Sequence, residues 1–262
     1  MVLWSRVLNN VIEGNTKLED KSTFDFADPY DSLISEYDAR NFAFSTLKNR
    51  YEMQTGKSLD DDMLIALRLV DNESKKLTNA GVIFADNCPF RHSRLFCVRW
   101  NGLTKAGGFI DALDSAEFTG SIIKLLDDGL AFIRRNNRYS KSTKMPDYDE
   151  QSYRESLINA LVHRSYRVLG SEIHIDIFDD RMTIYSPGGS IDALFLQDIT
   201  SANISSKVRN PIIANMFTCL GYMEQKGRGL ENICLRYKAY TKMPVITSTA
   251  SSFFITLPNL NY

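Results

Sequence analysis

The segment from Tyr153 to Gly189 constrains the fold more than any other part of the chain. Within it, Glu155, Asn159 and His163 recur at intervals of four residues. On an α-helix this spacing places three side chains along one side, as a polar stripe. Four apolar residues lie away from the stripe: Leu157, Ile158, Leu161 and Val162. The segment therefore predicts a helix with one buried face.

A β-hairpin follows this helix. Ile173, Ile175 and Ile177 alternate with other residues, a period of two that is typical of a strand with one buried face. Asp179 and Asp180 are most simply explained as a tight turn, after which residues 182–185 return as the partner strand. The hairpin ends in the sequence Ser186, Pro187, Gly188 and Gly189, where the backbone can bend sharply or approach a ligand. A polar helix stripe opposite this glycine turn predicts a pocket.

A second glycine pair lies further along the chain. Lys226, Gly227, Arg228 and Gly229 directly precede a helical pattern. Such a pair occurs often by chance, but backbone N–H groups at a helix N-terminus bind phosphate, and the two basic side chains add positive charge. Lys207 and Arg209 offer the same charge, with a solvated basic face as the alternative interpretation.

Composition limits the class of protein. The 262 residues are 44% hydrophobic and 24% charged with a net charge of −1, as in an ordinary globular protein with no global reason to bind nucleic acid. The four cysteines show no CxxC spacing, so we expect reduced thiols and no structural metal. No apolar run reaches the roughly 18 to 20 residues of a membrane span, and no secretory signal is recognised. We expect a cytoplasmic protein that does not bind membranes.

The chain is predicted to divide into three parts: an irregular segment over residues 1–30, an α/β region over 31–145, and a C-terminal domain over 146–262. The boundary follows the polar stretch 136–149, which is typical of a linker or surface loop. The spacing of apolar residues and turn signals predicts helices over 31–51, 60–69, 118–135 and 212–220, and strands over 93–100, 245–247 and 252–257.

Four motifs in order carry a resemblance to a known family. They read RESLINALVHRSY, IHIDIFDDRMTIYSPGG, SSKVRNPIIANMF and GYMEQKGRGLENI. Together they resemble the RecG C-terminal-like, or divergent AAA-4, ATP-binding proteins, which are known as transcriptional regulators or helicase-related proteins. The resemblance is dense from Tyr148 to Leu257 and fainter upstream. It implies a fold distantly related to the GHKL (Bergerat-fold) ATPases, an α/β two-layer sandwich with helices on one face of a mixed sheet.

The resemblance also implies roles for individual residues. Glu155 would position an attacking water, and Asn159 would hold Mg²⁺ against the phosphates. The two glycine boxes of those ATPases match residues 186–189 and 227–229. Ser186 stands where the ATPases carry an adenine-binding aspartate, and a hydroxyl lacks the charge that strengthens that contact. Family members commonly carry a Schlafen-like AlbA domain and a winged helix, and we recognise neither in this sequence.

These observations favour a regulatory protein that binds ATP and Mg²⁺ and hydrolyses ATP weakly or not at all. One alternative is an interaction module that keeps the fold without the nucleotide, in which Glu155 and Asn159 belong to a solvated helix face. Another is a nucleic-acid-binding accessory protein, with contacts through nearby basic residues or through another domain or chain. His163 is either a structural histidine or a participant in the chemistry. A homodimer is left open.

Overall fold

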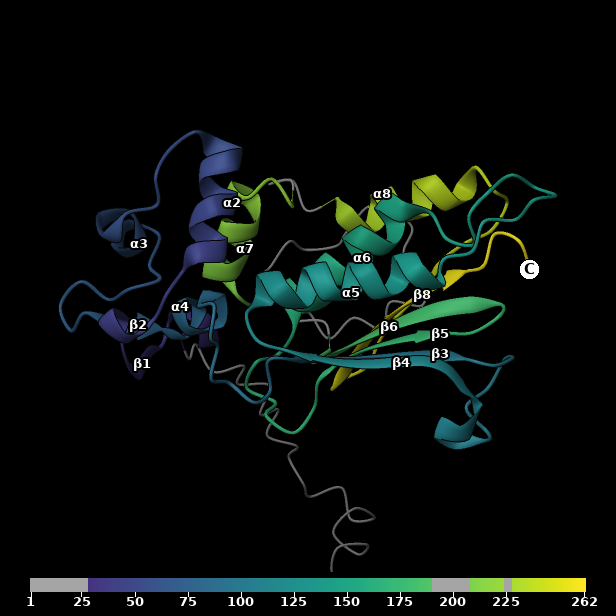
Figure 1. Ribbon diagram of the computed structural model, residues 1–262, viewed down its shortest axis with the longest axis horizontal. Coiled ribbons are helices and arrows are strands. Elements are labelled where there is room, and N and C mark those ends of the chain that lie inside the picture. The colour runs from purple at the N-terminus through teal and green to yellow at the C-terminus, as the bar shows by residue number, and fades with distance from the viewer. Residues whose placement is uncertain (1–27, 190–207, 224–227) are drawn as a thin grey trace, which may run out of the picture.

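The computed structural model describes residues 28–189, 208–223 and 228–262, and it contains a mixed six-stranded sheet with helices on one face (Figure 1). The predicted α/β fold class is therefore confirmed. The strand order is β4-β3-β5-β6-β8-β7. The strands are β3 (Arg94–Trp100), β4 (Ala112–Thr119), β5 (Ile173–Ile177), β6 (Arg181–Pro187), β7 (Val245–Ser248) and β8 (Ser252–Pro258).

The predicted hairpin is the centre of this sheet. β5 and β6 pair antiparallel, with Ile175 opposite Ile184, and both side chains are buried. On its other side β5 runs parallel to β3. A parallel pair requires a long crossover, which here contains β4, α5 (Ile122–Asn136) and α6 (Glu150–His163). The predicted boundary between residues 145 and 146 thus lies inside the crossover, and strands from both sides of it share one sheet.

Helices α5, α6 and α8 (Gly229–Lys238) lie side by side over the sheet in Figure 1. Helix α6 packs against α5, α8 and β6 and contributes much of the core, since Leu157, Ile158 and Leu161 are fully buried. None of the helices in the described ranges is long and apolar enough to cross a membrane.

A smaller layer lies beside the sheet and is built from the N-terminal elements of the described chain and one helix of its C-terminal half. Its elements are η1 (Tyr30–Ser32), β1 (Ile34–Asp38), η2 (Ala39–Asn41), α2 (Ser45–Thr55), α3 (Asp61–Ala66), β2 (Lys76–Thr78), α4 (Asn79–Phe84) and α7 (Pro211–Cys219). Strands β1 and β2 form a two-stranded antiparallel sheet. Helix α7 belongs to the C-terminal half of the sequence but packs against η1 and α2 (Figure 1).

Two sequence-based boundaries are wrong. The helix predicted from residue 31 is a strand over Ile34–Asp38, because Ile34 pairs with Thr78, a partner that local spacing does not reveal. The helix predicted from Phe118 begins at Ile122, because Phe118 belongs to β4 and Ser121 is the N-cap, accepting a hydrogen bond from the Lys124 N–H.

A buried carboxylate connects the small layer to the C-terminal half. Asp31 accepts hydrogen bonds from the backbone N–H groups of Ile212 at 2.7 Å and Ile213 at 3.0 Å, in the first turn of α7. A helix N-terminus favours a negative charge. Burial nevertheless raises the pKa of Asp31, while the two N–H bonds act in the opposite direction. The side chain therefore both caps α7 and joins two distant segments of the chain.

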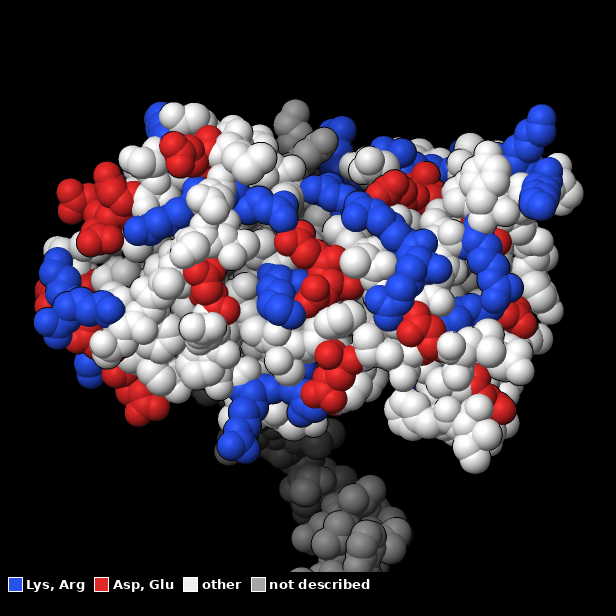
Figure 2. All heavy atoms as spheres, in the orientation of Figure 1, with Lys and Arg blue, Asp and Glu red and all other residues white. Residues whose placement is uncertain are grey.

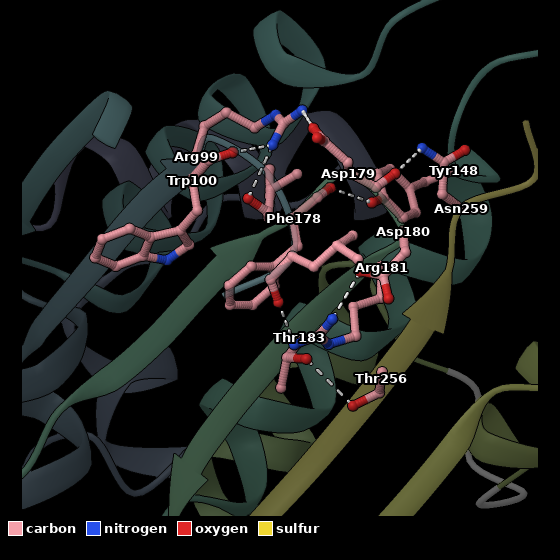
Figure 3. A network of polar contacts seen from close by, with 12 residues as sticks. Arg99, Trp100, Tyr148, Phe178, Asp179, Asp180, Arg181, Thr183, Thr256 and Asn259 are labelled. Atoms are coloured by element: carbon pink, nitrogen blue, oxygen red, sulfur yellow. Dashed lines mark hydrogen bonds and ion pairs between the residues drawn. The ribbon is translucent and has the colours of Figure 1, made fainter. Parts of the chain in front are cut away.

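A second network fastens the hairpin turn, at the sheet end drawn in Figure 3. The buried guanidinium of Arg99 on β3 donates hydrogen bonds to the carbonyl of Trp100 and the carboxylate of Asp179. Asn259, just after β8, donates to the Asp179 carbonyl through its side chain and to the Asp180 carbonyl through its backbone, each at 2.7 Å. The prediction of a tight turn at Asp179 and Asp180 is confirmed.

Replacing Asp31 with alanine is expected to lower the free energy of unfolding by about 1–3 kcal/mol, because two buried N–H groups lose their acceptor. Urea unfolding followed by circular dichroism measures this loss. Asp128→Ala is the matched control, because its carboxylate pairs with Lys124 on an exposed helix surface, where such pairs contribute about 0.3–0.5 kcal/mol. Equal losses in the two variants would contradict the role given to Asp31.

Candidate functional site

Helix α6 positions the polar stripe predicted from the sequence. It begins after Asp149, whose carboxylate accepts hydrogen bonds from the Ser152 N–H at 2.9 Å and from its hydroxyl at 2.7 Å. The buried leucine and isoleucine face fixes how the helix is rotated on the sheet. Glu155, Asn159 and His163 are consequently all only partly buried.

The start of helix α8 lies directly against Glu155 and Asn159. A Cβ atom added to Gly229 would lie 1.9 Å from the Glu155 Oε1 atom and 3.0 Å from the Asn159 Nδ2 atom. Both distances are too short for a larger residue unless these side chains move. The resemblance implied that Glu155, Asn159 and the second glycine box serve one nucleotide site, and the structure brings Glu155, Asn159 and Gly229 into contact.

Two hydrogen bonds hold the side-chain amide of Asn159, and both are made by its nitrogen atom. Its Nδ2 atom donates to the Glu155 carbonyl at 2.8 Å and to Glu155 Oε1 at 3.1 Å. Both bonds use the nitrogen, so the oxygen, which is the atom that a hard cation binds, takes part in neither. Within the described ranges no group of three His, Cys, Asp or Glu side chains is placed to hold a metal. A cation here would depend on oxygen atoms of its ligand as well as on the protein.

The glycine turn after β6 is contacted by protein groups. Gly188 has a φ angle of +96°, and a Cβ atom there would lie 2.4 Å from an Arg209 guanidinium nitrogen. A Cβ atom on Gly189 would lie 1.7 Å from the Thr249 carbonyl oxygen. The buried Ser186 hydroxyl donates a hydrogen bond to the Ala160 carbonyl of α6 at 2.8 Å. These close approaches within the chain are sufficient by themselves to require glycine at positions 188 and 189.

Arg209 and Asn210 satisfy the last carbonyl groups of α6. Arg209 donates to the His163 carbonyl at 2.9 Å and to the Gly189 carbonyl at 2.7 Å. The fully buried Asn210 donates to the Val162 carbonyl at 2.8 Å and to the Arg164 carbonyl at 2.9 Å. Helix ends leave such carbonyl groups without an intrahelical partner. The structure therefore gives Arg209 a contact inside the protein, where the sequence suggested a phosphate contact or a solvated face.

Asn210 was missed by the sequence analysis. Its place immediately before Pro211, the first residue of α7, marks a helix start. That signal does not reveal that the side chain turns back to the end of a different helix.

His163 ends α6 beside Arg209. Burial, with a smaller contribution from the positive charge of Arg209, lowers its pKa from 6.5 to about 4. The imidazole is therefore neutral at pH 7 and offers a hydrogen-bonding group without a charge.

The remaining predicted residues are distributed as follows. Arg228 directly precedes α8 and is exposed. Lys207, Lys226 and Gly227 lie outside the described residues. Figure 2 shows basic and acidic side chains interspersed over one face of the molecule.

These features define a class of protein: an α/β sandwich in which a helix with a polar stripe faces the glycine start of a second helix. Residues 170–257 match the model of a family described as "Putative ATP-dependent DNA helicase recG C-terminal". This match confirms the RecG C-terminal-like resemblance for that part of the chain.

Among solved structures, the chain is similar to the crystal structure of the DIP2311 protein from Corynebacterium diphtheriae. The TM-score is 0.70 at 18% sequence identity, over 88% of this chain and 46% of the other. The chain thus spans about half of that protein, and the likeness concerns the fold alone. None of the curated proteins matches the chain.

The histidine at the end of α6 provides a measurable test of this site. NMR titration of the His163 ring is expected to give a pKa of about 4, and Arg209→Gln is expected to raise it. Because the folded-state pKa is lowered, the neutral ring stabilises the fold fully above pH 6.5, and this stabilisation is lost as the pH falls towards 4. Arg236→Gln, an exposed change on α8, serves as the control and should leave the pKa unchanged. A His163 pKa near 6.5 in the wild-type protein would contradict the desolvated placement of this ring beside Arg209.

Proposed function

We propose that the chain is a regulatory protein that binds ATP with Mg²⁺ where helix α8 begins, opposite Glu155 and Asn159, and that hydrolyses it weakly or not at all. The observation that carries this proposal is the contact of Gly229 with both polar side chains of α6. Residues from two distant parts of the sequence meet there, as a phosphate site between two helices requires. The matched family's description as an ATP-dependent helicase region supports a nucleotide as the ligand.

The chemistry of this place favours a phosphate accompanied by a cation. Helix α8 has ten residues, and its first backbone N–H groups and its dipole attract an anion. The exposed Arg228 adds positive charge beside them. The Glu155 carboxylate already lies at this helix start, so a phosphate would experience repulsion between like charges. A divalent cation supplies the charge that offsets this repulsion, with the Asn159 oxygen as one ligand.

Hydrolysis would depend on Glu155. A carboxylate at this place would accept a hydrogen bond from water and orient it towards the terminal phosphate. In the structure the same carboxylate accepts the Asn159 amide at 3.1 Å, so orienting water would require this hydrogen bond to loosen or be shared. Slow turnover is the expected consequence.

Selectivity for adenine is expected to be low. The Ser186 hydroxyl donates its hydrogen to the Ala160 carbonyl. It could therefore bind a nucleotide base only as a hydrogen-bond acceptor. A neutral acceptor binds less strongly than a carboxylate. ATP and GTP should therefore differ little in affinity. DNA or another nucleic-acid partner would be reached through another domain or chain, in the cytoplasm.

A second candidate is an interaction module that has lost the nucleotide. It is favoured by close contacts at the glycines of the two glycine boxes that the structure describes, since a Cβ atom on Gly188, Gly189 or Gly229 would meet protein atoms. In that case the polar stripe serves to hold α6 against α8.

Thermal unfolding and titration calorimetry with Mg²⁺ and ATP distinguish the two candidates. We expect millimolar Mg-ATP to raise the melting temperature of the wild-type protein, because a ligand that binds only the folded state stabilises it. Asn159→Ala should weaken binding about tenfold or more, since it removes the proposed cation ligand. Asn232→Ala, on the exposed side of α8, is the matched control and should bind as the wild type does.

Removing Mg²⁺ with a chelator should abolish most of the ATP effect, because the repulsion from Glu155 is then not offset. Absence of stabilisation by Mg-ATP would exclude the nucleotide proposal and leave the interaction module. Equal binding by Asn159→Ala and the wild type would place the nucleotide elsewhere.

A further inference from the structure

Strand β4 forms an open edge of the large sheet. It pairs with β3 on one side, and among the described strands none pairs with its other side. Exposed and half-buried side chains alternate along all eight residues of the strand. In Figure 1 β4 lies at the front of the sheet, with the 3₁₀ helix η3 (Gly108–Asp111) just beyond its start. The outer edge of β4 therefore presents a long row of backbone hydrogen-bonding groups.

Apart from one bulge near its start, this edge lacks the usual protection against pairing with another strand. Soluble proteins protect open edges with lysine, proline or bulges, and the sequence of β4, ALDSAEFT, contains neither lysine nor proline. Its two acidic residues are neutralised within the molecule, since Asp114 pairs with Arg135 at 2.7 Å and Glu117 pairs with Arg94. The one register irregularity with β3 lies near the start of β4. An incoming strand would meet no net charge along the edge.

Apolar side chains continue this surface at one end. Phe109 and Ile110 on η3 are 72% and 95% exposed, and Leu113 on β4 is 55% exposed. Three large apolar groups at one end of an open strand favour covering by a partner.

We propose that this edge is the interface between two copies of the chain, whose β4 strands pair antiparallel across a two-fold axis and join the two sheets into one. The strand is self-complementary about Ser115. Each Leu113 would then lie opposite Glu117 of the second copy, Asp114 opposite Ala116, and Ala112 opposite Phe118. No like charges face each other. The proposal is independent of the nucleotide site.

The alternative registers that keep each face of the sheet continuous are less favourable. A register shifted by one residue would turn the buried faces of the two sheets in opposite directions, so the axis must pass through a residue. Centring on Asp114 places Asp111 opposite Glu117, with two like charges together. Centring on Ala116 places Asp114 opposite the apolar Phe118. The Ser115 register also carries Phe109 and Ile110 of each copy just past Thr119, the last residue of the other copy's β4.

Sedimentation equilibrium and light scattering test this interface. We expect the wild-type protein to be a dimer and Ser115→Lys to raise the dimer dissociation constant at least about tenfold, because two ammonium groups would face each other on the axis. The exposed position of Ser115 allows a folded monomer, which circular dichroism verifies. Thr247→Lys is the matched control, since Thr247 is also exposed and lies on β7, at the opposite edge of the sheet.

A charge-pair experiment tests the two-fold axis itself. Ser115→Glu alone should dissociate as Ser115→Lys does, and mixing the two variants should restore a dimer containing one of each. A monomeric wild-type protein would overturn the proposal. So would dissociation caused equally by Thr247→Lys, or a mixture of the two Ser115 variants that stays monomeric.

Discussion

Helix α6 lies in the middle of the molecule with one side in the core, and the rest of the fold depends on satisfying the polar groups at its two ends. Asp149 provides the N-cap at the start of the helix. At the other end Arg209 and Asn210, which lie just before α7, supply donors for three consecutive carbonyl groups. Buried carbonyl groups without donors would cost about 1–3 kcal/mol each. The position of α7 is thus tied to α6 by hydrogen bonds as well as by apolar packing, and Asp31 in turn ties the N-terminal layer to α7.

The parts of this architecture that follow from local pattern were predictable. The apolar spacing of α6 and the alternation in β5 depend on residues a few positions apart, and both elements were placed correctly. Strand β4 was missed because the apolar residues of ALDSAEFT do not alternate regularly with polar ones, which is the pattern that indicates a strand. Ile34–Asp38 was misassigned because its pairing with β2 depends on residues about 40 positions away. The local sequence does not indicate such a distant strand partner.

The candidate site, too, was predictable from the sequence only in part. The sequence predicted that Glu155 and Asn159 would face a glycine-rich helix start, since the helical period fixes their side and the resemblance supplied the opposing segment. It did not reveal which groups contact the glycines. Arg209 against Gly188, Thr249 against Gly189 and Glu155 against Gly229 are packing contacts, and packing is determined only when the whole sheet has formed. A glycine in such a motif therefore has at least two explanations, a ligand or another part of the same chain, and the three-dimensional arrangement decides between them.

The bond between Asp31 and the start of α7 has a consequence for the order in which the protein is made. Ile212 and Ile213, whose N–H groups Asp31 binds, follow Asp31 in the sequence by 181 and 182 residues. At typical synthesis rates of about 5–20 residues per second, roughly 10–40 s pass between the appearance of Asp31 and that of its helix. During this interval the carboxylate and the apolar surface around η1 and α4 must remain exposed to water or to chaperones. The first structured segment of the described chain is thus completed by one of the last helices to be synthesised.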